Sequence, residues 1–177
     1  MLVAAVVEEL CGREGVALGV GALAAGIAAA ELLARRPTPL VLVGTAGAYP
    51  GGPPVGTVVT ARRVGLASAG ALAGLGYVPL APGPLDLPPV PGLLACDVAC
   101  LTAITTDPTL AGKLGADWQI EHMEAFGVAL ACARAGVPLR VVLGVTNAVG
   151  PDAHAQWRAN RARMQEAAVL AAERTPG

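Results

Sequence analysis

The chain has 177 residues, a length typical of one domain that buries its own hydrophobic core, and we expect a single domain over residues 1–177. Apolar residues make up 54% and charged residues 14% of the chain, which excludes an intrinsically disordered protein. The 12 basic and 13 acidic residues leave a net charge of −1, so we expect no nucleic-acid partner. The uncharged stretch 64–85 is interrupted by five glycines and three prolines, so we expect no membrane partner either.

The N-terminus and the cysteines indicate a cytoplasmic protein without a metal site. The first ten residues, MLVAAVVEEL, lack the basic start of a secretory signal. Cys96 and Cys100 are four residues apart, but no second close cysteine pair and no nearby histidine completes a set of zinc ligands. We therefore expect these two cysteines, with Cys11 and Cys132, to be small buried thiols in a reducing cytosol.

The predicted elements alternate between strands and helices. In chain order we predict strands at 2–7 and 16–20, a helix at 22–36, strands at 39–43 and 55–61, a Gly/Pro-rich loop at 65–93, a strand at 98–104, a helix opening with the N-cap Asp107 and Pro108, a strand at 118–121, a helix at 122–135, a strand at 138–145 and a helix at 153–173. The strands are continuous apolar runs, which is typical of strands covered on both faces. This alternation predicts an α/β fold of three layers, α/β/α, around a mixed central sheet.

Ligands of such sheets bind at the carboxyl ends of the strands. This rule selects the residues that directly follow predicted strands: Glu8 and Glu9, Gly44 to Gly47, Thr105 to Asp107, and Thr146 with Asn147. Glu8 and Glu9 are adjacent, so their side chains point in different directions. Either one of them points into a cleft, or both belong to a solvated helix start, where carboxylates suit the helix dipole.

Three further features each have two explanations. Glu124 opens a nearly all-apolar helix, so its carboxylate needs donors, which are either the amides of a helix cap or the hydroxyls of a ligand such as a sugar. Asn147 either contacts a heterocycle through its amide or shapes a turn. The glycines at 19, 21 and 26 either let the backbone approach a small ligand or let a helix pack closely on its neighbour.

The motifs also occur in a characteristic order. AAVVEEL is followed by VALGVGALAAGIAAAELL, LVLVGTAGAYPGGPPVGTVV, ITTD and finally EHMEAFGVALACARAGVPLRVVLGVTNAVGP. This order resembles the nucleoside phosphorylase/nucleosidase superfamily. Within it, the chain is most similar to the futalosine hydrolases of menaquinone biosynthesis, which share the E-x-M-E helix opening, an asparagine followed by Val-Gly, and a tryptophan soon after.

The resemblance implies a role for each matching residue. Glu9 corresponds to the carboxylate that activates the attacking water, and Asn147 to the residue that contacts purine N7 and the 6-substituent. Glu124 corresponds to the residue that binds the ribose 2′- and 3′-hydroxyls. The other implied substrate-binding residues are Met123 beneath the sugar, Thr45 where the family holds the nucleophile, Gly47 in the same turn, Thr109 and Leu110 at the base through their backbone, and Thr146 beside the asparagine.

The implied activity is hydrolysis of the N-glycosidic bond of a futalosine-like purine nucleoside, with release of hypoxanthine. Asn147 donates hydrogen bonds but transfers no proton, which favours a 6-oxopurine over adenine as the leaving group. The resemblance also implies a homo-oligomer and no cofactor.

Two alternatives stay open at this point. One is a purine nucleoside phosphorylase, although Leu143 stands where many members carry an arginine, and phosphate binding needs fixed positive charge or amide donors. The other is a degenerate member that binds nucleosides without turnover. It is favoured by the short segment 11–15, where a helix and a strand of the family are expected to be missing.

Overall fold

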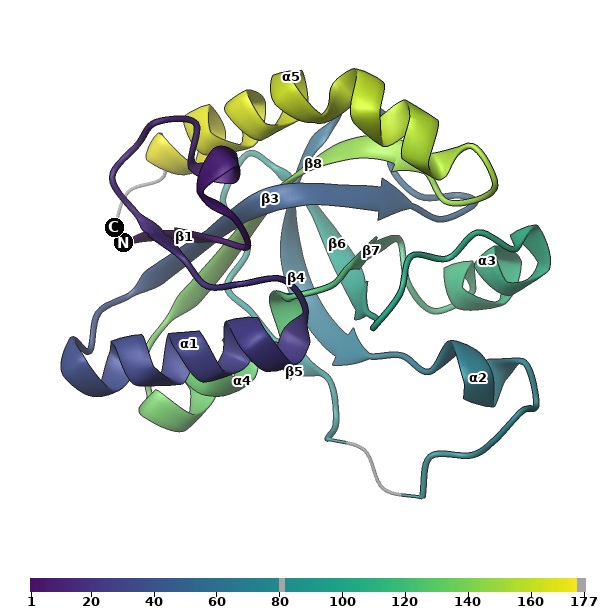
Figure 1. Ribbon diagram of the computed structural model, residues 1–177, viewed down its shortest axis with the longest axis horizontal. Helices are drawn as coiled ribbons and strands as arrows, with labels where there is room; N and C mark the ends of the chain where they lie inside the picture. Colours follow the sequence, from purple (N-terminus) through teal and green to yellow (C-terminus); the bar gives the residue numbers. More distant parts are fainter. Residues whose placement is uncertain (80–81, 175–177) are drawn as a thin grey trace.

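The computed structural model describes residues 1–79 and 82–174, in which eight strands form one mixed sheet (Figure 1). The strands are β1 (Leu2–Ala4), β2 (Val16–Ala17), β3 (Leu40–Ala48), β4 (Val58–Leu66), β5 (Leu85–Asp86), β6 (Leu94–Cys100), β7 (Ile120–His122) and β8 (Leu139–Ala148). The helices are the 3-10 helix η1 (Val7–Leu10) and the α-helices α1 (Ala22–Arg35), α2 (Ala69–Leu72), α3 (Pro108–Gly115), α4 (Ala125–Ala135) and α5 (Ala153–Glu173).

The long strand β3 organises the sheet. One edge of β3 pairs in parallel with β1 at its start and antiparallel with β7 at its end, while the other edge pairs in parallel with β8. β8 also pairs antiparallel with β4, β4 pairs in parallel with β6, and β6 pairs in parallel with β7. Strands β3, β8, β4, β6 and β7 therefore form a closed circuit, so the mixed sheet is strongly curled.

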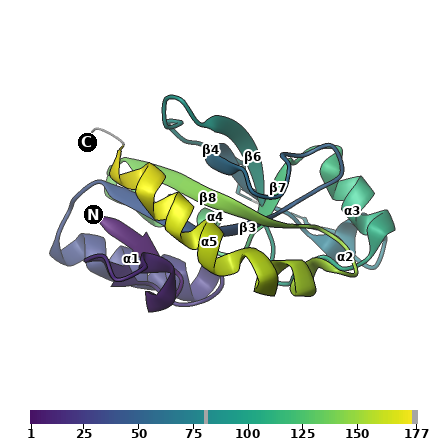
Figure 2. The ribbon, with the colours of Figure 1, turned by 90° about the horizontal axis from the view of Figure 1, so that it is seen from above.

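Helices cover both faces of this sheet. α1 and α4 pack side by side on one face, and α5 lies across β3 and β8 on the other (Figures 1 and 2). Glycines allow both contacts to be close. A Cβ on Gly127 of α4 would collide with the carbonyl oxygen of Ala22 in α1, and a Cβ on Gly144 of β8 would lie 2.5 Å from the carbonyl oxygen of Met164 in α5. The layered α/β prediction is confirmed, and the glycine at 26 serves helix packing because its Cβ position faces Gly127.

Helix positions agree well with the sequence, whereas several strand boundaries differ. α1 and α5 lie where they were predicted, Asp107 caps α3 through the amide of Leu110, and the left-handed Gly136 ends α4. The predicted strand 2–7 was too long, because the chain leaves the sheet after Ala4 and forms η1. Residues 11–15 join η1 to β2 without a further helix or strand.

The segment Gly44–Gly47 was expected to follow a strand but lies inside β3. The predicted strand 98–104 begins and ends earlier, as β6. The predicted loop 65–93 contains α2 and β5, and its residues 80 and 81 lie outside the described part of the chain.

The described residues hold no group of three or more possible metal ligands and no helix long and apolar enough to span a membrane. The four cysteines are free thiols, of which Cys96, Cys100 and Cys132 are buried and Cys11 is half-buried.

Candidate active site

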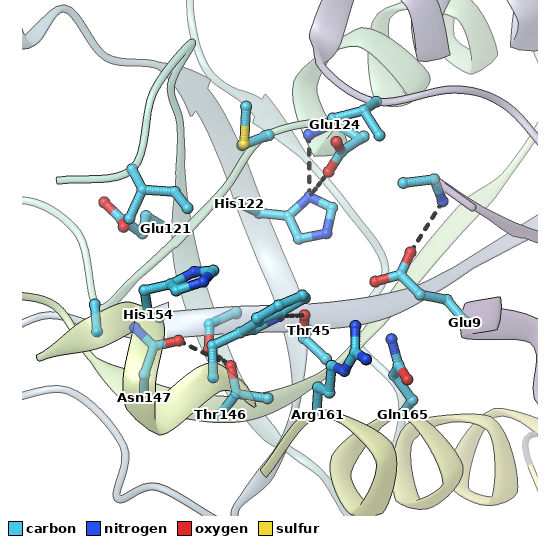
Figure 3. A pocket seen from close by; sticks show the side chains of 18 of the residues that line it. Glu9, Thr45, Glu121, His122, Glu124, Thr146, Asn147, His154, Arg161 and Gln165 are labelled. Carbon is cyan, nitrogen blue, oxygen red and sulfur yellow. Dashed lines mark hydrogen bonds and ion pairs between the residues drawn. The ribbon is translucent and has the colours of Figure 1, made fainter. Parts of the chain in front are cut away.

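A cavity of about 700 Å³ opens where β1, β3 and β8 end (Figure 3). η1 supplies one wall, the junction between β7 and α4 a second, and the first turns of α5 a third. Most of the lining is apolar, and a small number of polar side chains converge on the space, which is the usual character of a small-molecule site.

Glu9 approaches the cavity from η1. Its side chain is almost fully buried, and its Oε2 accepts a hydrogen bond of 3.2 Å from the amide of Ala5. Burial raises the pKa of the Glu9 carboxyl above its ordinary value of 4.5, because the charged form loses hydration, and the nearby His122 partly offsets this rise. Glu9 is the member of the Glu8–Glu9 pair that is buried, since Glu8 is exposed.

Glu124 and His122 form a connected pair at the junction of β7 and α4. Oε1 of Glu124 accepts a hydrogen bond of 2.8 Å from the amide of Gly21, and Oε2 lies 3.3 Å from Nδ1 of His122. Nδ1 also accepts the amides of Glu124 and Ala125, each at 3.1 Å. The helix start is therefore capped by His122, and the Glu124 side chain makes no capping hydrogen bond.

Asn147 lies at the end of β8. Its Oδ1 is 2.8 Å from the hydroxyl of Thr146, and its Nδ2 donates to the carbonyl oxygen of Ala148 at 3.2 Å. Gly47 makes room for this amide, because a Cβ there would lie 2.9 Å from Nδ2 of Asn147. One N–H of Asn147 remains to serve a ligand.

Two more polar groups complete this end of the cavity. Glu121 is buried beside Asn147, and its oxygens accept the hydroxyl of Tyr49 at 2.9 Å and the amide of Thr105 at 3.3 Å. Burial raises the pKa of the Glu121 carboxyl. Thr45 on β3 accepts a hydrogen bond of 3.3 Å from the indole nitrogen of Trp157.

The α5 wall presents His154, Trp157, Arg161 and Gln165. His154 stacks on Trp157 with ring centroids 5.5 Å apart, and the Arg161 guanidinium lies 5.0 Å from the centre of the Trp157 ring. None of these four residues was predicted for the site from the sequence. The spacing of three and then four residues places all four on one helix face, and that pattern is the signal that could have found them.

Seven of the nine residues predicted for the site line this one cavity: Glu9, Thr45, Gly47, Met123, Glu124, Thr146 and Asn147. Thr109 and Leu110 are not among its lining residues. The Asp107 cap winds both into the first turn of α3, and the cavity wall is formed there by Leu101, Ala103 and Ile104. Glu121, His122 and the four α5 residues are polar or aromatic lining groups that were not predicted for the site.

No protein-family model matches the sequence. The chain is 34% identical over 165 residues to a futalosine hydrolase of Thermus thermophilus, covering 81% of this chain and 73% of that protein. It is also 34% identical over 149 residues to a futalosine hydrolase of Streptomyces coelicolor, covering 72% of this chain but 61%, less than two thirds, of that protein.

Solved structures share the fold at low sequence identity. A futalosine hydrolase mutant of Helicobacter pylori superposes with a TM-score of 0.82 at 14% identity, covering 97% of this chain and 95% of the other. A 5′-methylthioadenosine/S-adenosylhomocysteine nucleosidase of S. pneumoniae with a transition-state inhibitor gives a TM-score of 0.80 at 15% identity, covering 97% and 95%. These similarities confirm the resemblance noted in the sequence, and the chain belongs to the futalosine hydrolase family.

Proposed function

We propose that the protein hydrolyses the N-glycosidic bond of a purine nucleoside, with futalosine as the substrate and hypoxanthine as the released base. The observation that carries this proposal is the convergence of Glu9, Glu124 and Asn147 on one cavity. These residues come from η1, the start of α4 and the end of β8, and they supply the three functions that the reaction needs.

Cleavage of this bond builds positive charge on the sugar and moves an electron pair into the base. Ionised Glu9 takes a proton from water as the water oxygen bonds to C1′ and the C1′–N bond breaks. General-base assistance of this kind is worth on the order of 10²–10⁴ in rate. The Glu124 carboxylate accepts hydrogen bonds from the ribose hydroxyls, and both carboxylates stabilise the charge on the sugar.

The leaving base needs a donor for the electron pair that it receives. The free N–H of Asn147 donates to N7 or to the 6-oxo group of the purine, while the base takes up its proton from water. A neutral amide fits a 6-oxopurine, which supports hypoxanthine rather than adenine as the product.

We also propose that the protein assembles as a homo-oligomer in the cytoplasm. Leu23 and Ile27 of α1 are 83% and 62% exposed, and they line an apolar groove between α1 and α4. An exposed apolar surface of this kind supports association with a second copy. The buried thiols of Cys96, Cys100 and Cys132 support a reducing compartment.

A base-release assay tests the proposed reaction. Futalosine, aminofutalosine, methylthioadenosine and inosine are each incubated with the protein, with and without phosphate, and the free base is measured by chromatography. Hypoxanthine released from futalosine without phosphate supports the proposal. Release that requires phosphate identifies a phosphorylase, and ligand binding without release from any substrate identifies a non-catalytic member of the family.

A further inference from the structure

His122 is a buried polar residue that lines the cavity and has no role in the reaction as described above. Its ring lies between the carboxylates of Glu9 and Glu124 and points into the cavity (Figure 3). Nδ1 faces the start of α4, so Nε2 is the nitrogen on the side of Glu9.

The contacts of Nδ1 determine where the ring proton resides. The two amides of Glu124 and Ala125, each 3.1 Å from Nδ1, favour the neutral tautomer with its proton on Nε2 over the one whose Nδ1–H donates to Oε2 of Glu124 at 3.3 Å. In the favoured neutral tautomer, and equally in the charged ring, Nε2 carries a proton. His122 is therefore a hydrogen-bond donor at Nε2.

Gly44 defines the space that this donor faces. Nε2 of His122 and Oε1 of Glu9 each lie 3.3 Å from the point that a Cβ on Gly44 would occupy. The absence of a side chain at Gly44 leaves room between the two atoms. Leu143, the residue paired with Gly44 on β8, is fully buried and brings no polar group.

We infer that His122 positions the attacking water, an inference that rests on the proposed hydrolysis. Nε2–H donates to the water oxygen while the water donates one hydrogen to Oε1 of Glu9. These two contacts aim a lone pair of the water at C1′. As the C1′–O bond forms, the proton passes to Glu9 and the C1′–N bond breaks, and His122 keeps its own proton throughout.

Two variants separate this role from the capping of α4. His122→Asn keeps an oxygen that accepts the amides at positions 124 and 125, as an N-cap asparagine does, but its side chain is too short to place a donor where Nε2 faces Glu9. His122→Phe keeps a ring and loses both the cap and the donor. We expect His122→Asn to lower kcat for futalosine by about 100- to 1,000-fold, the usual effect of removing one donor from a reaction centre. Its KM should stay within about threefold of the wild-type value, because Glu124 is still held by the hydrogen bond from the amide of Gly21.

The proton position is measured directly in the wild-type protein, which guards against a variant that fails to fold. The chain has two histidines, so ¹H–¹⁵N correlation spectra, assigned with a His154→Asn variant, report the tautomer of His122. A proton on Nε2 supports the inference, and a neutral ring with its proton on Nδ1 overturns it. The inference is also overturned if His122→Asn keeps the wild-type kcat. It is likewise overturned if the two variants change kcat by the same factor and KM by the same factor. Failure of the wild-type protein to release any base overturns the proposed hydrolysis itself, so the two failures are distinguishable.

Discussion

At the residue scale, the proposed role of Glu9 conflicts with its burial. Glu9 must be ionised to accept a proton, whereas burial disfavours the ionised form. Burial raises the pKa of this carboxyl above 4.5. We therefore expect kcat/KM for futalosine to fall as the pH falls through the raised pKa, on an acidic limb that lies above the range of an exposed glutamate. A profile measured from about pH 4 to about pH 9 tests this. An acidic limb at or below 4.5 would contradict the role given to Glu9.

The same burial predicts a cost in stability. Because the folded-state pKa lies above the unfolded value, the folded protein binds the proton more tightly, and stability falls as the pH rises from 4.5 through the folded-state pKa. Each unit of upward shift costs about 1.4 kcal/mol at neutral pH. Glu9→Gln should thus have a higher melting temperature than wild type at pH 7, while being inactive.

The control for this comparison is pH itself, because the difference should shrink on acidification to about pH 4, where Glu9 is protonated in both states. If the wild-type protein is instead the more stable of the two at neutral pH, the interactions of the ionised Glu9 carboxylate outweigh its loss of hydration, and the prediction is wrong.

Asn147 decides which base departs. Asn147→Asp replaces an amide donor with a carboxyl group that, when protonated, can transfer its proton to N7, which suits a 6-aminopurine. We expect the ratio of kcat/KM for aminofutalosine over that for futalosine to rise at least about tenfold in this variant. Both substrates are measured side by side by base release, and an unchanged ratio would show that Asn147 does not select the base.

Glu9, Glu124 and Asn147 could be predicted from the sequence. Each of them lies next to a predicted strand or helix, and each matches a motif of the family. His122 was missed because a lone histidine next to a Met-Glu pair carries no periodic or motif signal of its own. Its importance arises from Glu9 and Gly44, which reach it only after the chain has folded.

At the element scale, the contact between α1 and α4 positions the sugar-binding carboxylate. Gly127 sits against the carbonyl oxygen of Ala22, one residue after the amide that binds Glu124. Gly127→Ala should force the helices apart, lower the free energy of unfolding by about 1–3 kcal/mol and raise KM. Chemical denaturation and base-release kinetics measure the two effects.

Gly112 in α3 is the matched control, because a Cβ there meets no atom within 4 Å. Gly112→Ala should be neutral or stabilising by up to about 1 kcal/mol, as expected for alanine in a helix interior. Equal stabilities of the two variants would mean that the α1–α4 contact adjusts without cost.

The elements also show where sequence patterns succeed. The caps at Asp107 and Gly136 and the Ala-rich stretch of α1 are local signals, so helix positions were predicted closely. The extent of β3 was not predicted, because glycines such as Gly44 and Gly47 are typical of turns. They lie within a strand to leave room for Glu9, His122 and Asn147, which come from other parts of the chain.

At the scale of the whole molecule, alternation of elements predicted the layered α/β class but not the closed circuit of strands. That circuit depends on β8 pairing with both β3 and β4, and on β7 pairing with the far end of β3. Such pairings join residues far apart in the sequence and leave no local pattern. The cavity forms where the circuit and η1 meet. The complete set of residues that line it could therefore be identified only from the structure.

The proposed homo-oligomer gives a prediction for the molecule as a whole. If the groove between α1 and α4 is covered by a second copy, light scattering after size-exclusion chromatography should give a mass of at least twice 17.5 kDa. Ile27→Glu places a charge in the apolar contact and should shift the mass to that of the monomer, since an unpaired buried charge is costly. Leu94→Glu, at a comparably exposed residue on β6, should leave the mass unchanged. A monomeric wild-type protein, or equal dissociation by both variants, would rule out this groove as the contact between copies.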